Sequence, residues 1–403
     1  MVNLILAVIY LSFISLGLPD SLLGSAWPTV YGEFGVPLSF AGGVSMIIAV
    51  GTIVSSLLSD RLTRRFGSGV VTAVSVGMTA AALFGFSVSG AYWQLCLLAV
   101  PYGLGAGAVD AALNNYVALH YASRHMSWLH CMWGVGASAG PYIMGAAITG
   151  GAGWHMGYRY VAYIQLALAA MLLLSLPLWK KREAASGETR GARPLSLPQI
   201  LALPGVREVL VCFFCYCALE QTAGLWASSY LVLKNGMSAD EAASLAGLYF
   251  IGITVGRGIS GFLTFRLSDR AMVRLGAGVM LLGAACIPLG GALTLLGLVA
   301  FGLGSAPVYP CIIHSTPALF GAERSQAIIG VQMAAAYLGT CLMPPLFGLT
   351  AQYLSAALFP LFLVIQLALM FLMYEKLLRA AKKNVTRPVS PSAASSSKTS
   401  EGL

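Results

Sequence analysis

The sequence predicts an all-α membrane protein in which twelve transmembrane helices form two pseudo-symmetric six-helix bundles. Composition is the first reason: 58% of the 403 residues are hydrophobic and 9% are charged, whereas a soluble domain carries roughly 25% charged residues. Secondly, apolar segments long enough to cross a ~30 Å hydrocarbon core recur along the whole chain. Thirdly, this pattern of segments starts again after a polar stretch at residues 180–193.

Each predicted span is an apolar run bounded by polar residues, glycine or proline. The first run is interrupted by Gly17, Pro19 and Asp20, and a proline, which lacks an N–H group, helps to break or bend a helix at membrane depth. The predicted spans are approximately 4–31, 40–58, 69–86, 92–119, 126–148, 160–178, 209–233, 242–264, 271–289, 292–316, 326–350 and 354–374.

The two groups of six spans look like copies of one another. At an offset of about 200 residues, Val100-Pro-Tyr-Gly-Leu-Gly105 matches Val299-Ala-Phe-Gly-Leu-Gly304. We therefore expect four regions in the chain. These are an N-terminal six-helix bundle (1–179), a cytoplasmic linker (180–205), a C-terminal six-helix bundle (206–377) and a disordered cytoplasmic tail (378–403).

Lysine and arginine residues orient the chain, because they concentrate on the cytoplasmic side of membrane proteins. With the N-terminus inside, only Arg159 and Lys234 fall outside. The inner side then carries Arg61, Arg64, Arg65, Arg124, the basic residues of 180–207, Arg266, Arg270, Arg274, Arg324 and the tail. We expect a multi-pass protein of the cell (inner) membrane with both termini inside, and a monomer. The net charge of +9 reflects this topology and not nucleic-acid binding.

Four charged residues lie deep inside predicted spans, where an ionised side chain costs at least ~2.5 kcal/mol: Asp20, Asp110, Glu220 and Arg257. Asn114 lies one helical turn from Asp110, so both occupy a face that cannot contact lipid. Withdrawal from water favours a protonated carboxyl group and access to water favours an ionised one, so Asp110 can load and release a proton. For proton coupling Asp110 is the first choice and Asp20 the second. The alternative for Asp110 is a structural ion pair or helix contact.

Polar and aromatic residues in the same spans predict a substrate site. Glu220 and Gln221 lie in the seventh span, where the repeat places Gln221 opposite Asp20. Arg257 is expected to pair with Glu220 or Asp110, or else to extend to the inner interface. Amides, charged groups and aromatic rings together suit a sugar. The other candidates, for each of which helix packing is the alternative, are Asn114, Asn115, His130, Trp133, Tyr309, His314 and Gln332.

The two-times-six pattern and the turn after the second span resemble the major facilitator superfamily. Ser56-Leu-Leu-Ser-Asp60-Arg61-Leu-Thr-Arg64-Arg65 is similar to the superfamily's inner-loop signature, G-x-x-x-D-R-x-G-R-R, with serine and threonine in place of its two glycines. The resemblance implies the major facilitator fold and an inner gate formed by Asp60, Arg61, Arg64 and Arg65. The alternative is that these residues only contribute the positive charge that marks the cytoplasmic side of a membrane protein.

Within that superfamily, the fourth and fifth spans resemble the fucose:proton symporter family. Asp110-Ala-Ala-Leu-Asn-Asn-Tyr-Val117 is similar to that family's E-T-A-A-N-P-Y-V, which places Asp110 at the acidic residue used in proton coupling. Asp20 corresponds to the family's first-helix aspartate, which implies sugar binding. Trp133 takes the place of an asparagine of the family's substrate site.

We therefore expect proton-coupled symport of a small polar solute, with a monosaccharide favoured, by alternating access. The alternative is a proton-coupled antiporter that exports drugs or other amphipathic compounds. Gly136-x-x-x-Gly140-Pro141 resembles part of the drug:proton antiporter motif, although small-residue packing also explains it. A membrane sensor or an embedded enzyme is a third class, and no nucleophile–base or metal pattern supports an enzyme. No metal or cofactor is expected, and the expected partners are the solute, protons and lipid.

Overall fold

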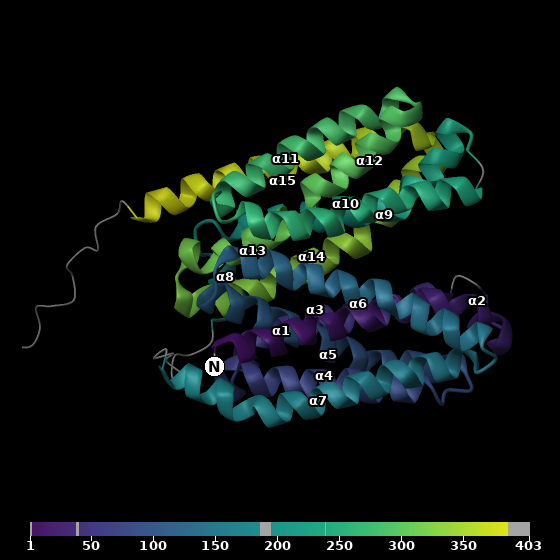
Figure 1. The fold of residues 1–403 in the computed structure, drawn as a ribbon. Coiled ribbons are helices and arrows are strands. Elements are labelled where there is room, and N and C mark those ends of the chain that lie inside the picture. The colour runs from purple at the N-terminus through teal and green to yellow at the C-terminus, as the bar shows by residue number, and fades with distance from the viewer. Residues whose placement is uncertain (1, 38–39, 186–194, 238, 386–403) are drawn as a thin grey trace, which may run out of the picture.

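The computed structural model describes residues 2–37, 40–185, 195–237 and 239–385, and the regular structure in these ranges is helical (Figure 1). The first half contains α1 (Val2–Asp20), α2 (Leu22–Phe34), α3 (Ala41–Phe66), α4 (Ser68–Phe86), α5 (Tyr92–His120), α6 (Ser123–Thr149), α7 (Gly153–Ala185) and α8 (Leu197–Leu201). The second half contains α9 (Val206–Asn235), α10 (Ala239–Leu263), α11 (Asp269–Cys286), η2 (Ile287–Leu289), α12 (Gly291–Ser305), α13 (Val308–Phe320), α14 (Ala322–Thr350), η3 (Ala351–Ser355), η4 (Ala356–Leu358) and α15 (Phe359–Val385).

Nine stretches of the described residues are long and apolar enough to cross a membrane. One of these stretches, Ala322–Ala380, contains both α14 and most of α15. Two long helices, α6 and α10, are not among the nine, and α6 carries arginine and histidine in its first turns. The chain is thus a multi-pass membrane protein, while the twelve crossings and the N-in orientation stay predictions.

The helices form two groups, α1–α7 on one side and α9–α15 on the other (Figure 1). In the first group α5 packs against α3 and α4, and α6 packs against α1. In the second group α9 packs against α14 and α15, and α12 against α10 and α11. The groups meet where α3 contacts α14, α6 contacts α10, and α5 contacts α13 and α14.

The helices extend beyond some of the predicted bundle ends. Helix α7 continues to Ala185, which lies in the predicted linker, and α15 continues to Val385, which lies in the predicted tail. Residues 186–194 of the predicted linker and 386–403 of the predicted disordered tail lie outside the described residues. The domain boundaries stay a prediction.

Two predicted spans are broken helices. Helix α1 ends at Asp20 and α2 begins at Leu22, so the first break directly follows Pro19. The span predicted at 292–316 is also divided, because α12 ends before Pro307 and α13 begins after it. A proline cannot donate the backbone hydrogen bond that would continue α12.

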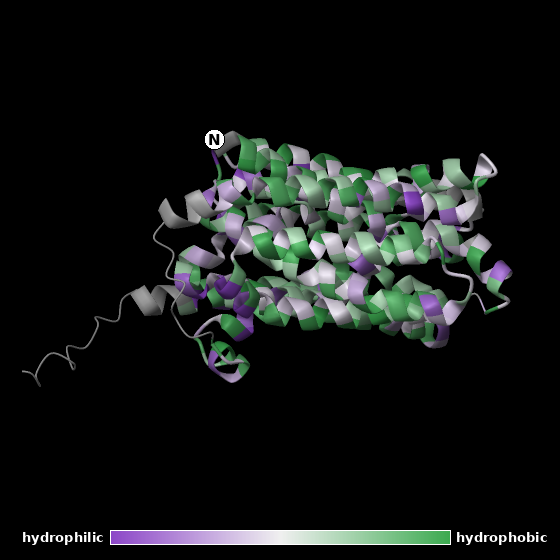
Figure 2. Ribbon diagram, turned by 90° about the horizontal axis from the view of Figure 1, so that it is seen from below, coloured by the Kyte–Doolittle hydropathy of each residue, from purple (hydrophilic) through white to green (hydrophobic). Residues whose placement is uncertain are grey.

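The two ends of the molecule differ in character. The N-terminus and the last turns of α15 lie at the same end (Figure 1), which also carries Arg64 at the end of α3 and Arg124 at the start of α6. We call it the basic end. Figure 2 shows hydrophobic residues along the length of the bundle, with most of the strongly hydrophilic ones near its two ends. This distribution is expected of a helix bundle whose long axis spans a bilayer, with its two ends in the polar interfaces.

Glycine allows α3 and α5 to approach closely. Gly103 and Gly107 of α5 face the backbone carbonyl groups of Ile48 and Thr52 in α3, and a Cβ atom at either glycine would overlap those oxygens. Backbone-to-backbone contact of this kind is typical of membrane helix pairs that are held by small residues.

We expect Gly107→Ala to destabilise the protein by ~1–3 kcal/mol, because the added methyl group forces α3 and α5 apart. The matched control is Gly77→Ala in α4, where an added Cβ meets no atom within 4 Å and alanine is the better helix former. Thermal unfolding of the purified variants should give a lower midpoint for Gly107→Ala only. Equal midpoints would contradict the close approach of the two helices.

Candidate functional site

A cavity of about 460 Å³ lies between the two groups of helices. Its wall contains residues of α1 to α7 from the first group, and of α9, α10, α13 and α14 from the second. The volume lies within the ~300–1,000 Å³ of small-molecule sites. The polar side chains in the wall are Asp20, Ser45, Thr52, Tyr102, Asp110, His130, Trp133, Tyr158, Glu220, Gln221, Arg257, Tyr309, Tyr337 and Thr340.

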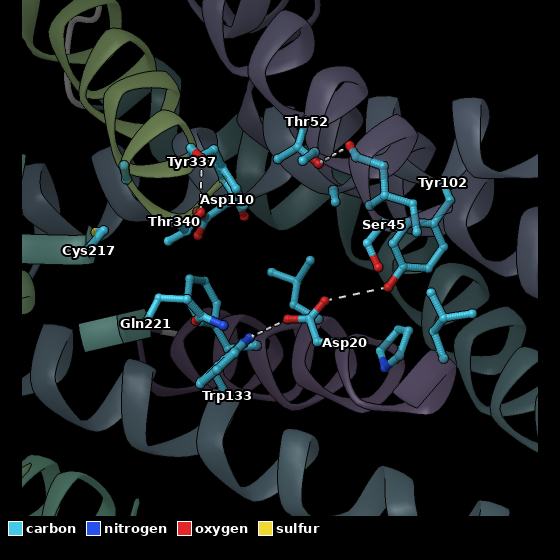
Figure 3. Close-up of a pocket in the computed structure, with 18 of the residues that line it drawn as sticks. Asp20, Ser45, Thr52, Tyr102, Asp110, Trp133, Cys217, Gln221, Tyr337 and Thr340 are labelled. Carbon is cyan, nitrogen blue, oxygen red and sulfur yellow. Dashed lines mark hydrogen bonds between the residues drawn. The ribbon is translucent and has the colours of Figure 1, made fainter. Parts of the chain in front are cut away.

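Asp20 is the last residue of α1, at the break that Pro19 introduces. The indole N–H of Trp133 donates a hydrogen bond to Asp20 Oδ2 (2.9 Å), and the hydroxyl of Tyr102 makes a long one to Oδ1 (3.5 Å). Figure 3 shows the carboxylate between these two side chains. Asp20 therefore faces the cavity with two neutral donors and no cation bonded to it among the described residues.

Asp110 begins a chain of hydrogen bonds that leads from the cavity into the first group of helices. The amide of the fully buried Asn114 donates to Asp110 Oδ1 (2.8 Å) and to the Asp110 carbonyl oxygen (2.9 Å). The oxygen of the same amide lies 3.1 Å from Nε2 of His130. Because that oxygen can only accept, Nε2 of His130 carries the hydrogen.

His130 and Tyr309 connect the two groups of helices at the cavity. Their rings form an edge contact with centroids 4.7 Å apart, and the other side of the His130 ring meets Phe13 at 5.4 Å. Tyr309 belongs to α13 of the second group. The wall beside Asp110 is thus aromatic and comes from both groups.

Arg257 is the cationic side chain of the wall. Its Nη2 atom lies 3.1 Å from Oε1 of Glu220, and the side chains of Arg257 and Glu220 are 7% and 23% exposed. The guanidinium carbon lies 5.6 Å from the ring of Trp133, which is within the range of a cation–π contact. Trp133 therefore contacts Asp20 through its N–H group and Arg257 through its ring.

Three residues predicted for substrate binding lie away from the cavity. Asn115 accepts a hydrogen bond from Ser325 (2.5 Å) at the junction of α5 and α14. Gln332 is fully buried and accepts from Thr316 (3.2 Å). His314 lies at the basic end, within 2.6 Å of Asp269. Asn114 contacts Asp110 without lining the wall itself.

The residues predicted to form the inner gate lie where α3 meets α14. Nε of Arg64 donates to Oδ1 of Asp60 (2.9 Å), and Nη2 of Arg64 donates to the carbonyl oxygen of Glu323 in α14 (2.7 Å). Arg65 stacks on the neighbouring Phe66 ring in the same helix, and Arg61 lines a small pocket beside α8. Among the described residues, Arg64 is thus the arginine of the predicted gate that bonds across the two groups.

Several residues of the wall carried no signal in the sequence. Tyr102, Tyr337 and Thr340 are neutral side chains in apolar segments, and nothing in their spacing distinguishes them from packing residues. The repeat offset of about 200 residues places Tyr309 opposite Asp110, and only this correspondence singles out a tyrosine of the wall from the sequence. Among the residues that the structure describes, no three His, Cys, Asp or Glu side chains gather as metal ligands.

Comparison with known proteins supports the fold that this geometry indicates. The family model of the Major Facilitator Superfamily matches residues 9–344 and 209–400. A solved structure of FucP in the outward conformation gives a TM-score of 0.74 at 14% identity, covering 91% of this chain and 98% of that chain; FucP is the fucose:proton symporter of E. coli. At this identity the likeness concerns the fold alone.

Two curated relatives match at the level of sequence. Bypass of stop codon protein 6 of Saccharomyces cerevisiae is 22% identical over 64% of this chain and 56% of its own length. The 4-hydroxybenzoate transporter PcaK of Pseudomonas putida is 27% identical over 59% of this chain and 53% of its own length. The matched stretches thus span about half of each relative.

Because Arg257 and Glu220 form an ion pair, we expect substitutions at the two positions to change thermal stability non-additively. Glu220→Gln leaves the mostly buried guanidinium without its counterion, and loss of one partner of a buried pair costs ~3–5 kcal/mol, with less expected here because Glu220 is partly exposed. The double variant Glu220→Gln, Arg257→Met removes both charges and should recover part of the lost thermal stability. The midpoints of the two single variants and the double variant measure the coupling, and additive shifts would argue against the pair.

Proposed function

Because the chain belongs to the major facilitator superfamily, a family of transporters, we propose that it is a proton-coupled symporter of a small polar solute. A monosaccharide is the favoured solute, and uptake across the cell (inner) membrane is the favoured direction. The observation that carries this proposal is the pair of carboxylates, Asp20 and Asp110, in one cavity between the two groups of helices. We further propose twelve crossings, cytoplasmic termini and a monomeric transporter.

Asp110 is the proposed proton carrier and Asp20 the second candidate. The two carboxylates line one cavity, where a negative charge on one disfavours a negative charge on the other, and the cavity's arginine is already paired with Glu220. A proton on either carboxylate removes this repulsion. A carboxyl group in a closed cavity loses contact with water, which favours its protonated form, and it regains that contact when the cavity opens. Opening and closing would therefore change how readily Asp110 holds its proton.

The contacts between the two groups suggest how the site is reached. Hydrogen bonds between them link Arg64 to Glu323, Gln326 to Ser59, and Asn115 to Ser325, all at the basic end. Separation of the groups there would open the cavity to the side that we propose to be cytoplasmic. In this proposal Asp60, Arg61, Arg64 and Arg65 form the gate, and Arg64 is its main contact.

The wall supports a neutral polyhydroxyl solute. Gln221 and Thr340 supply neutral hydrogen-bonding groups, and Trp133 supplies a ring for the C–H face of a sugar. Its carboxylates outnumber its single arginine, and that arginine is occupied, so an anionic solute would meet net repulsion. Asp20 and the Glu220–Gln221 pair face the cavity from opposite groups of helices and could bind one solute between them.

An aromatic carboxylate is the second candidate solute. Proteins named as 4-hydroxybenzoate transporters are among the relatives of this chain, and Arg257 beside Trp133 could bind a carboxylate and its ring. Such a solute would have to displace Glu220 from Arg257. Binding would therefore become easier in Glu220→Gln, whereas a sugar would lose a hydrogen-bond acceptor.

Transport in proteoliposomes with an internal pH dye tests the proposal. Monosaccharides and 4-hydroxybenzoate are added outside in turn, and symport should acidify the interior in response to one class. Asp110→Asn should abolish that acidification while exchange of labelled solute persists, because the neutral amide binds no proton at this position. Glu375→Gln, which removes a carboxylate paired with Arg274 away from the cavity, is the matched control and should behave as the wild type.

Each alternative gives a different result in the same vesicles. Internal alkalinisation on solute addition would identify antiport, and a panel of amphipathic drugs would follow. Acidification that survives in Asp110→Asn would assign the proton to another group, with Asp20→Asn the next variant. If internal pH changes with none of these solutes, proton symport of monosaccharides and of 4-hydroxybenzoate is refuted.

A further inference from the structure

A second cluster of polar side chains connects the two groups of helices at the basic end, away from the cavity. His314 of α13 lies with Nδ1 2.6 Å from Oδ2 of Asp269, the first residue of α11. Nε2 of the same ring lies 3.0 Å from the carbonyl oxygen of Tyr121, between α5 and α6. The other oxygen of Asp269 accepts a short hydrogen bond from Ser123. The cluster therefore joins α11 and α13 to the loop between α5 and α6.

Both ring nitrogens of His314 face groups that accept hydrogen bonds. A backbone carbonyl oxygen can only accept, and an ionised carboxylate likewise only accepts. A neutral imidazole has one N–H group and can donate a hydrogen bond to one of these acceptors. Its other nitrogen then points a lone pair at the second acceptor, which is unfavourable. Only the imidazolium donates to both. Asp269 stands in the first turn of α11, where a helix dipole interacts favourably with negative charge.

We propose that His314 and Asp269 form a proton-binding site that holds the basic end closed while the imidazole ring carries its proton. Separation of the groups removes the Tyr121 carbonyl group, which is one of the two acceptors of the imidazolium, so the open state holds the proton less firmly. The closed state then binds up to one proton more than the open state. By linkage, acid on this side favours closure and a rise in pH favours opening. The site requires neither a particular solute nor proton coupling at Asp110.

Two other imidazoles lie close to this cluster. Nδ1 of His120 lies 2.9 Å from the Tyr116 carbonyl oxygen, and His125 bonds to Tyr10 (2.8 Å) and meets the Tyr121 ring edge-on at 5.6 Å. These partners belong to the first group of helices. Cys311 of α13 lies 3.9 Å from Ser123, and Cys311 and Tyr374 of α15 each interact electrostatically with Asp269. Thiols and phenols ordinarily stay neutral below about pH 8. The permanent cations nearby are Arg270, which interacts with Tyr374, and Arg124, which stacks on Phe265 at 4.7 Å. Imidazoles are the groups whose charge changes between about pH 5 and 8, and the imidazole of His314 bonds both to Asp269 of the second group and to Tyr121 of the first.

The second half of the sequence lacks an acidic residue at the position that corresponds to Asp60, and the cluster contains a carboxylate that takes its place. The turn after α10 keeps Arg266, the counterpart of Arg61, but has Phe265 at the position that corresponds to Asp60 near the end of α3. Four residues later Asp269 supplies the missing carboxylate, and it bonds to Ser123 and His314. The first half closes on α14 through an arginine that is always charged, whereas the second half closes on the α5–α6 loop through a histidine that titrates.

Hydrogen–deuterium exchange of the full-length protein in detergent tests the site without any solute. Peptides from 117–125 and 308–320 are compared at pH 6 and pH 8, with labelling times scaled for the chemical rate of exchange. One linked proton changes the ratio of closed to open molecules by up to about tenfold per pH unit. We expect the protection of both peptides to be greater at pH 6. Equal protection at the two pH values would overturn the proposal.

Substitutions identify the group that responds. His314→Gln can donate to one acceptor but cannot titrate, so its protection should not change with pH. His125→Gln is the matched control, because His125 lies at the same end but bonds to Tyr10 within its own group of helices (2.8 Å), and its variant should keep the wild-type response. A response that persists in His314→Gln would refute the assignment. Asp269→Asn provides an independent test, since it should lower protection at pH 6 to the value seen at pH 8.

Discussion

A carboxylate inside a membrane protein is stable only where water, a donor or a countercharge reaches it, and this constraint explains much of the arrangement. Asp20 lies at a break in the first span, where Pro19 stops α1 and leaves the carboxylate facing a cavity. Its donors, Trp133 and Tyr102, are neutral. Asp110 is likewise supported by an amide. Neither has the firm ion pair that Glu220 has with Arg257, so neither carboxylate is fixed in one charge state by its surroundings.

Trp133 is central to the cavity because one side chain contacts groups from both halves. Its N–H group bonds to Asp20 of the first group of helices, and its ring lies against Arg257 of the second. A change of charge at Asp20 would alter the first contact, and the second would respond through the position of the ring. The indole thereby connects Asp20, the second candidate for the proton, with the ion pair on the opposite wall.

The hydrophobic pattern of the sequence predicted an all-helical membrane protein, and the family match confirms the superfamily. All four charged residues that lie in apolar segments line the cavity, because a charge at membrane depth must face a polar space. The sequence did not predict the position of His314. The repeat places it at the depth of Asn115, but its partners Asp269 and Tyr121 are distant in sequence. Neutral wall residues such as Tyr337 carry no such signal, since a tyrosine packs equally well in a core.

The close contact of α3 and α5 has a mechanical consequence. Glycines remove the side chains that would otherwise hold the two backbones apart, so α3 and α5 pack backbone to backbone. Asp60 lies near the end of α3 and Asp110 lies along α5. A movement that carries this helix pair away from α14 would therefore displace Asp110 as well, so the proposed gate and the proposed proton carrier would share one moving part.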